Sequence, residues 1–299
     1  MPCVPDVPPC FLAEPPPGLA PQSALFDAYE GVRTSSQGVT AWRDPRTQDQ
    51  TQPLQLTMSG TCGYDNSSTE AGGGYGSVVF DGRSCLGRLG VNLPAWSSAR
   101  TAPFTLLVVA KLDVPVSARP TDSYSLIQIS RTPTDYDFEA AFQVATRGNT
   151  SSSFLYDNQA GQAFGKLVMP ASYDEWAMYV FVRQPGGTAA AVYRSSQPRN
   201  GGVGTFPGGV ELIASQSVPP PGVSVQPDNL VLGADWRDNN TFVKGRLAVA
   251  AVYTTALDLG QLNDLYNLYA PRFGWARAPR RECVPPYAWV GLHPGVLAA

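Results

Sequence analysis

The run GADWRDNNTFVKGRLAVAAVYTTALDLGQLNDLYNLY, residues 233–269, decides the fold of this chain, because it joins a loop, an apolar strand and an amphipathic helix. Residues 247–253 are apolar throughout, which is typical of a strand buried on both faces. Asp258 and Gln261 form a capping-box pattern that starts a helix. Apolar side chains then recur on one side of that helix, at Leu259, Leu262, Leu265, Tyr266 and Tyr269. The run therefore predicts an inner strand and a helix that covers apolar surface.

Short apolar or alternating segments, separated by turn residues, recur along the rest of the chain. They are 54–58, 77–82, 104–112, 124–130, 138–145, 175–182, 189–196, 210–217 and 229–234. Their number and spacing fit two stacked antiparallel sheets. The expected fold class is all-β: a two-sheet antiparallel β-sandwich with a short C-terminal helix and Pro-rich terminal arms.

Length and composition favour one domain rather than two. A chain of 299 residues with 43% hydrophobic content can bury a large core, and 29 Gly with 28 Pro supply many turns. Residues 1–22 are too rich in proline for a helix or a central strand. We therefore expect an N-terminal arm over 1–22, a β-sandwich over 23–275 and a C-terminal arm over 276–299.

Charge and hydropathy exclude several classes of partner. A net charge of −3 with only 15% charged residues offers no basic surface for nucleic acid or an anionic membrane. No apolar run approaches the length of a membrane span, and the first residues lack the pattern of a signal peptide. The sequence is then that of a cytosolic protein or of a processed form, and we expect an extracellular, cell-surface or particle-surface location.

The five cysteines do not form the close pairs of a zinc site, so we expect no metal centre. Cys62 and Cys85 flank a Gly/Ser-rich insertion and are candidates for a disulfide. Cys3, Cys10 and Cys283 lie in the arms, where one must stay unpaired or link to another chain. Spacing alone leaves five free thiols as an equal alternative. Three sequons for N-glycosylation occur, at Asn66, Asn149 and Asn239.

Four segments, in their order and spacing, resemble the concanavalin A-like lectin/glucanase superfamily, and within it the laminin-G-like domains. These segments are 27–46, 76–86, 173–193 and 230–262. The resemblance covers roughly residues 25–275 and implies a jelly-roll β-sandwich. The family holds carbohydrate binders, adhesion modules, structural surface proteins and glycoside hydrolases, so the fold does not settle the function.

An enzymatic role is not favoured by the residues. The one histidine of the sequence, His293, lies in the C-terminal arm, so a Ser-His-Asp or Cys-His site within the domain would require that arm to fold over it. Asp135, Asp137 and Glu139 alternate as in a glucanase. However, Asp135 and Glu139 would stand about 13 Å apart on a regular strand, too far for a retaining pair of carboxylates. We expect a protein without catalytic residues, with glycoside hydrolysis as the enzymatic alternative.

Two groups of residues have the chemistry of a glycan site, in which an aromatic ring stacks on a sugar and Asp or Asn bonds its hydroxyls. One is Asp235, Trp236, Arg237, Asp238 and Asn239, and the other is Tyr156, Asp157 and Asn158. Either could hold a sugar or calcium, the only cofactor considered. The alternative is structural: Trp236 packs under its loop and the acids cap turns. Trp42, Trp96 and Trp176 are expected in the core or at its rim.

The arms point to assembly as a third class of function. Extended Pro-rich segments with cysteines and apolar anchors can dock on neighbouring subunits of a fibre, wall or particle. The alternative is that they are linkers or processing remnants. The sequence thus predicts a structural or adhesive surface module that self-associates through its arms and binds glycans, with a soluble lectin as the alternative.

Overall fold

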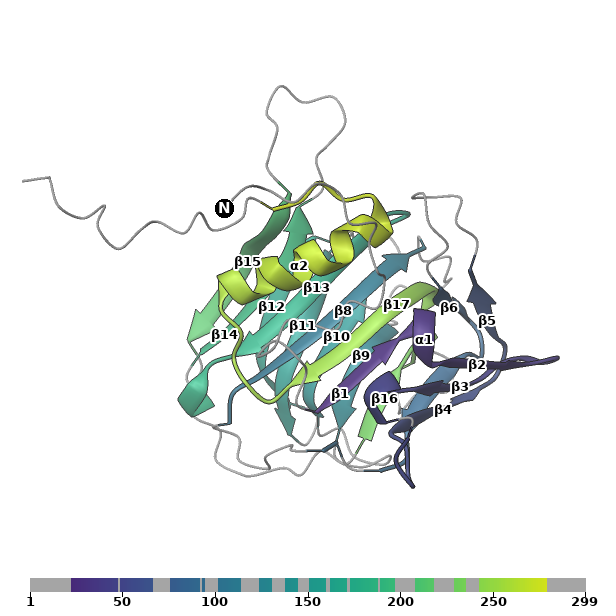
Figure 1. The fold of residues 1–299 in the computed structure, drawn as a ribbon. Helices are drawn as coiled ribbons and strands as arrows, with labels where there is room; N and C mark the ends of the chain where they lie inside the picture. The colour runs from purple at the N-terminus through teal and green to yellow at the C-terminus, as the bar shows by residue number, and fades with distance from the viewer. Residues whose placement is uncertain are drawn as a thin grey trace, which may run out of the picture.

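The computed structural model describes residues 23–47, 49–66, 76–91, 93–94, 102–113, 124–130, 138–144, 151–159, 162–170, 173–187, 189–196, 208–217, 229–234 and 242–278. These residues form two β-sheets and one long helix, stacked in three layers (Figure 1). All pairs of neighbouring strands are antiparallel. The expected β-sandwich is confirmed.

The first sheet, sheet A, lies between the helix and the second sheet. In spatial order its strands are β15 (Gly209–Ser217), β14 (Ala189–Ser196), β13 (Trp176–Arg183), β8 (Phe104–Leu112), β17 (Lys244–Tyr253), β6 (Ser77–Asp81) and β5 (Cys62–Asp65). A further strand, β1 (Ala24–Asp27), pairs with the second half of β17, while β6 pairs with its first half.

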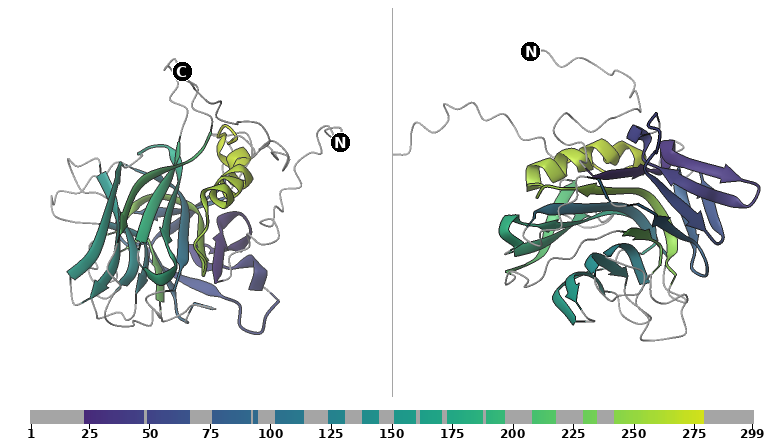
Figure 2. Two further views of the ribbon diagram at one scale, coloured as in Figure 1. Left: turned by 90° about the vertical axis from the view of Figure 1, so that its left-hand side faces the viewer. Right: turned by 90° about the horizontal axis from the view of Figure 1, so that it is seen from below.

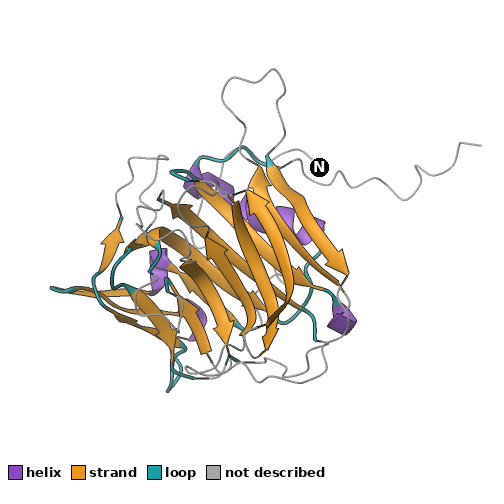
Figure 3. Cartoon of the chain, turned by 180° about the vertical axis from the view of Figure 1, so that it is seen from behind, coloured by secondary structure: helices purple, strands orange, loops and turns teal. Residues whose placement is uncertain are grey.

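The second sheet, sheet B, faces the viewer when the molecule is seen from behind (Figure 3). Its strands, in spatial order, are β12 (Gln162–Pro170), β11 (Ser151–Gln159), β10 (Phe138–Val144), β9 (Tyr124–Ser130), β16 (Asn229–Leu232), β7 (Leu86–Leu89), β4 (Gln55–Ser59), β3 (Gly38–Arg43) and β2 (Val32–Ser35). The helical elements are α1 (Ala28–Gly31), the short 3₁₀ turns Pro45–Thr47 and Pro185–Gly187, and α2 (Leu259–Phe273).

The central strands of sheet A are apolar on both faces because both faces are covered. In β13, Ala177, Tyr179 and Phe181 belong to the core between the sheets. The alternate residues Met178, Val180 and Val182 belong to a second core under α2. Strands β8 and β17 divide their side chains in the same way. Figure 2 shows α2 and sheet B on opposite sides of sheet A. The unbroken apolar runs in the sequence thus reflect two cores rather than one.

Helix α2 begins and packs as the sequence predicts, with one exception. The Gln261 amide donates to Asp258 Oδ1 and the Asp258 amide donates to Gln261 Oε1, both at 2.9 Å, which completes the capping box. Leu262, Leu265 and the tyrosines of the predicted stripe are buried. The predicted stripe also includes Leu259, and this part of the prediction is wrong because Leu259 is 45% exposed. It is the first residue of the helix, and its Cβ is directed back beyond the helix start.

The body of the domain continues to Ala278, three residues past the predicted boundary at 275. The Ala278 amide donates to Asn267 Oδ1 at 2.8 Å, and the Tyr266 hydroxyl donates to the Ala276 carbonyl at 2.7 Å. Burial raises the pKa of Tyr266 to about 12, so this hydroxyl stays protonated as a donor. Of the arms predicted over 1–22 and 276–299, residues 1–22 and 279–299 lie outside the described residues.

Candidate functional site

Several loops meet at one end of the sandwich, which we call the Asp81 end. It holds Asp81–Cys85, Asp113, Tyr173–Glu175, Gly233–Ala234 and Phe242–Lys244. Strand pairing brings them together, because Lys244 lies opposite Asp81 and the Asp113 amide donates to the Lys244 carbonyl. The Asp174 amide donates to the Leu112 carbonyl at 2.8 Å. Segments from five parts of the sequence therefore share this end.

The predicted glycan residues Asp235–Asn239 lie outside the described residues, but both ends of their segment are fixed. Ala234 and Phe242 form an antiparallel bridge across its base. The Val243 amide donates to the Gly233 carbonyl at 2.8 Å, and the Gly233 amide donates to the Leu126 carbonyl at 2.9 Å. The residues that flank segment 235–241 are therefore held in a hydrogen-bonded base at the Asp81 end.

At Gly233 the backbone of this base packs closely against Phe80 of sheet A. Its φ of +81° lies in the left-handed region, and a Cβ added there would stand 2.1 Å from the Phe80 ring. The same Cβ would come within 3.2 Å of the Cys85 carbonyl oxygen. Only glycine satisfies both the backbone conformation and the contact. The base of segment 235–241 is thereby packed beside the disulfide.

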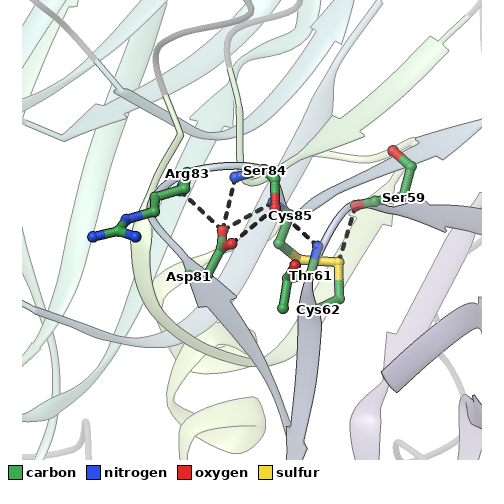
Figure 4. The surroundings of a disulfide bond; sticks show 7 residues. All are labelled: Ser59, Thr61, Cys62, Asp81, Arg83, Ser84 and Cys85. Atoms are coloured by element: carbon green, nitrogen blue, oxygen red, sulfur yellow. Dashed lines mark hydrogen bonds between the residues drawn. A yellow bond between two sulfur atoms is a disulfide. The ribbon is translucent and has the colours of Figure 1, made fainter. Parts of the chain in front are cut away.

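The disulfide joins Cys62 to Cys85, so of the two alternatives that the sequence left open for this pair, the disulfide is the one observed (Figure 4). Both cysteines are buried. Cys62 begins β5 in sheet A, while Cys85 directly precedes β7 in sheet B. The bond therefore links the two sheets at the Asp81 end, which the spacing of the cysteines does not reveal.

Asp81 holds the turn that leads to Cys85. Its Oδ1 accepts the backbone amides of Arg83, Ser84 and Cys85 at 2.9, 2.8 and 3.0 Å, and its Oδ2 accepts the Ser84 hydroxyl at 2.8 Å (Figure 4). Burial raises the pKa of this carboxyl, but the hydrogen bonds outweigh burial, so the pKa lies below its usual range. The charged carboxylate thus fixes the turn next to Gly233.

Exposed charges surround this turn. Lys244 Nζ lies 3.5 Å from Asp113 Oδ2, and both side chains are well exposed. Asp174 adopts a φ of 61°, which side-chain-bearing residues rarely take. Within the described part of the chain, no three His, Cys, Asp or Glu side chains gather closely enough to hold a metal ion. Calcium stays a prediction for the two groups 235–239 and 156–158.

The second predicted group does not join the first. Tyr156, Asp157 and Asn158 lie within strand β11, not in a loop. Asn158 is opposite Phe138, which is opposite Ser130 at the end of β9. By contrast, Leu232, just before segment 235–241, is opposite Ile127 near the start of β9. Asn158 and Leu232, the described residues nearest to each group in these ladders, therefore lie toward opposite ends of sheet B.

Of the other residues that the sequence analysis names, the structure describes some and not others. Asn66 is described and exposed, directly after β5. Trp42 is buried in the core, and Trp176 packs against Phe273 with ring centroids 4.8 Å apart. Others lie outside the described residues: Cys3, Cys10, Cys283, Trp96, Asp135, Asp137, Asn149 and His293. Glu139 falls in β10, of which only the backbone is described.

Two structural carboxylates were not singled out from the sequence. Asp81 is one, and the Asp81-Gly82 pair is a turn signal that would have indicated it. Asp44 is the other: it is fully buried and accepts the Leu25 amide at 2.9 Å and Arg46 Nε at 2.9 Å. The Asp44-Pro45 pair marks a turn, but its bond to Leu25 depends on tertiary structure.

No family model matches the sequence, and no curated protein matches it. Among solved structures, the chain is similar to the binding domain of Paraclostridial Mosquitocidal Protein 1, with a TM-score of 0.52, 11% identity and coverage of 81% of this chain and 52% of that one. It is similar to HCR/D-Sa-GBL1/C, with a TM-score of 0.51, 10% identity and coverage of 81% and 52%. It is also similar to a receptor binding domain, with a TM-score of 0.50, 11% identity and coverage of 82% and 50%.

The chain spans about half the length of these solved chains. At such low identity the likeness concerns the fold and not the function. This chain is an antiparallel β-sandwich of the kind found in those binding domains.

Proposed function

We propose that this protein is a non-catalytic recognition module that binds a glycan through segment 235–241 at the Asp81 end. The observation that carries the proposal is the base of this segment. It is closed by the Ala234–Phe242 bridge and packed through Gly233 against Phe80, beside the disulfide. Fixing the two ends of a segment reduces the conformational entropy that the segment loses when it binds a ligand.

The residue types in the segment suit sugar recognition. The indole of Trp236 offers a flat apolar face for a sugar ring, while Asp235, Asp238 and Asn239 offer acceptors and donors for hydroxyl groups. Arg237 would extend recognition to an acidic sugar. Asp235 and Asp238 are also the residues that would contribute carboxylate oxygens if calcium takes part.

The similar solved structures support a binding role, since two of them are described as a binding domain and a receptor binding domain. The order of the strands and the helix over sheet A is compatible with the concanavalin A-like, laminin-G-like family that the sequence resembles. We place the protein outside the cell or on a surface, because the Cys62–Cys85 disulfide fits an oxidising compartment. The helices that the structure describes include none long and apolar enough to cross a membrane.

A glycan array tests the proposal, with Trp236→Ala as the site variant and Tyr29→Ala as a control. Tyr29 is an exposed aromatic on α1, an element that does not belong to the Asp81 end as defined above. We expect the Trp236→Ala protein to lose binding by at least tenfold and the control to retain it. Equal binding by both variants would remove this segment as the site. Chelation with EDTA shows whether calcium contributes.

A second candidate is a structural or adhesive subunit, and one observation favours it. The described chain starts at Ser23, whose amide donates to the Val252 carbonyl near the end of β17. It stops at Ala278, beside Gly209 at the start of β15, toward the Asp81 end. Ser23 and Ala278, the described residues next to segments 1–22 and 279–299, thus lie toward opposite ends of sheet A, which suits head-to-tail contacts through those segments. Sedimentation of the full chain and of a chain without 1–22 tests this, since equal monomeric values would contradict it.

Glycoside hydrolysis is the outcome that would overturn a non-catalytic role. The measurement is the release of reducing sugar from candidate polysaccharides by the native protein. Release that disappears in Glu139→Gln would show that the predicted acidic strand is an active site. We expect no release from either protein.

A further inference from the structure

Asn66 occupies a defined position on the outside of the molecule. It follows β5, the edge strand of sheet A, and is exposed. The preceding residues are anchored: Asp65 Oδ2 lies 3.3 Å from Arg246 Nη2, and the Tyr64 hydroxyl donates to the Ala28 carbonyl at 3.2 Å. The Asn66 side chain is thus carried by a fixed strand end and is open to solvent.

The sequence around Asn66 is an acceptor for N-linked glycosylation, Asn66-Ser67-Ser68. Transfer of such glycans takes place in the same oxidising compartments in which disulfides form. The Cys62–Cys85 bond closes across β5 and β6, the two strands that flank this acceptor. The chain therefore has an exposed acceptor asparagine and a disulfide, and the disulfide fits the oxidising compartment in which N-linked glycans are transferred.

We propose that Asn66 is a site of N-linked glycosylation. The donor would be a lipid-linked oligosaccharide diphosphate. The Asn66 Nδ2 atom forms a bond to the anomeric carbon of the first sugar, while the bond from that carbon to the diphosphate breaks. The leaving lipid diphosphate takes the electron pair, and the amide nitrogen loses one proton.

The position of Asn66 is compatible with recognition at the Asp81 end. Cys62 pairs with Phe80 beside that end, whereas Asp65 pairs with Ser77 at the other end of the same ladder. Four strand residues place Asn66 about 13 Å further along β5. A glycan there would leave segment 235–241 open. A glycan at Asn239, by contrast, would stand within the proposed recognition segment.

The glycan would also protect an edge strand of sheet A from pairing with another chain. Strand β5 is an edge of sheet A among the described strands, and an exposed edge can pair with another chain. A bulky polar glycan attached at the end of this strand blocks such an approach. This inference depends on the compartment of the protein and not on what the protein binds.

The test is site mapping on the full chain secreted from eukaryotic cells. Peptide N-glycosidase treatment in ¹⁸O water converts each glycosylated Asn to labelled Asp, and we expect the label at Asn66. Asn66→Gln and Ser68→Ala should each lose one glycan's mass, while Ser68→Thr, which keeps the acceptor pattern, should retain it.

Unmodified Asn66 in the secreted wild-type chain would overturn the proposal. So would a glycosidase-sensitive mass that is unchanged in both Asn66→Gln and Ser68→Ala. An unreduced digest that shows the Cys62–Cys85 peptide confirms that each variant has folded. Because the measurement is the mass of the chain, failure here would leave glycan recognition at segment 235–241 untouched.

Discussion

Arg272, in the last turn of α2, forms a two-pronged ion pair with Asp27 at the end of β1, although 245 residues separate them in the sequence. The distances are 2.6 Å from Nη1 to Oδ2 and 3.0 Å from Nη2 to Oδ1. Asp27 Oδ1 also accepts the Tyr29 amide at 2.9 Å and so caps α1. One carboxylate thus ties the first strand of the domain to its last helix.

We predict that Asp27→Ala lowers the free energy of unfolding by about 2–3 kcal/mol, because it leaves a largely buried guanidinium without its partner and removes the cap of α1. Chemical denaturation measures this. Asp113→Ala is the matched control: its pair with Lys244 is exposed, and its loss should cost less than about 1 kcal/mol. Equal effects of the two changes would contradict the structural importance of the Asp27–Arg272 pair.

Loss of the disulfide should destabilise the domain by about 3 kcal/mol, since the bond closes a loop of 23 residues that also links the sheets. Comparison of unfolding midpoints for the wild-type protein with and without reductant measures the effect. The double variant Cys62→Ala/Cys85→Ala should be insensitive to reductant. If reductant shifted its midpoint by as much as that of the wild type, the stabilising bond would lie elsewhere.

Asp81 predicts a dependence of stability on pH. Its folded-state pKa lies below the unfolded value, so its contribution is present above the usual Asp pKa of about 3.9 and is lost as the pH falls through the folded value. Asp81→Asn should therefore cost roughly 1–2 kcal/mol at pH 7 and reduce the loss of stability below about pH 4. Unfolding curves from pH 7 to pH 2 compare the two proteins. An unchanged acid slope in Asp81→Asn would refute the role of this carboxylate.

Gly233→Ala should destabilise the domain by about 2–4 kcal/mol, because alanine is strained at positive φ and its Cβ would overlap the Phe80 ring. Gly90→Ala is the control, since a Cβ at Gly90 meets nothing within 4 Å. If segment 235–241 is the recognition site, Gly233→Ala should also weaken glycan binding at temperatures where the protein is still folded. Retained affinity would show that the base does not position the segment.

The packing of α2 on sheet A is tested by two leucines on the same helix. Leu265→Ala should cost about 2–4 kcal/mol because Leu265 is fully buried in the core under the helix. Leu259→Ala should change stability by less than about 0.5 kcal/mol because Leu259 is exposed. Thermal unfolding of both variants gives the comparison, and a similar loss in both would contradict the observed orientation of α2.

Strands with strong local signals were predictable from the sequence. Residues 104–112, 124–130 and 189–196 form β8, β9 and β14 within the predicted limits. Strands β5, β7 and β11 were not recognised, because Cys62–Asp65 and Leu86–Leu89 are short and Ser151–Gln159 is largely polar. Their β-structure comes from pairing with neighbours that are distant in sequence.

The candidate site was predictable only in part. The residue types in 235–239 indicated sugar chemistry, but their relation to Asp81, Cys85 and Phe80 depends on pairing between β6 and β17. Similar residue types occur at 156–158, and the register of β11 places them far along the sheet from Leu232, which precedes the first group. Composition identifies the chemistry of a segment but does not state which segments meet.

The sequence by itself determined the β-sandwich, the inner strand 247–253 and the capped helix after it, because periodicity and capping are local properties of the chain. Only the tertiary structure decided that Cys62 and Cys85 join the two sheets, that Asp27 pairs with Arg272, and that Gly233 must lack a side chain. Each of these contacts joins residues that are far apart in the sequence. No local pattern indicates such a contact, because it forms only when the strands have paired.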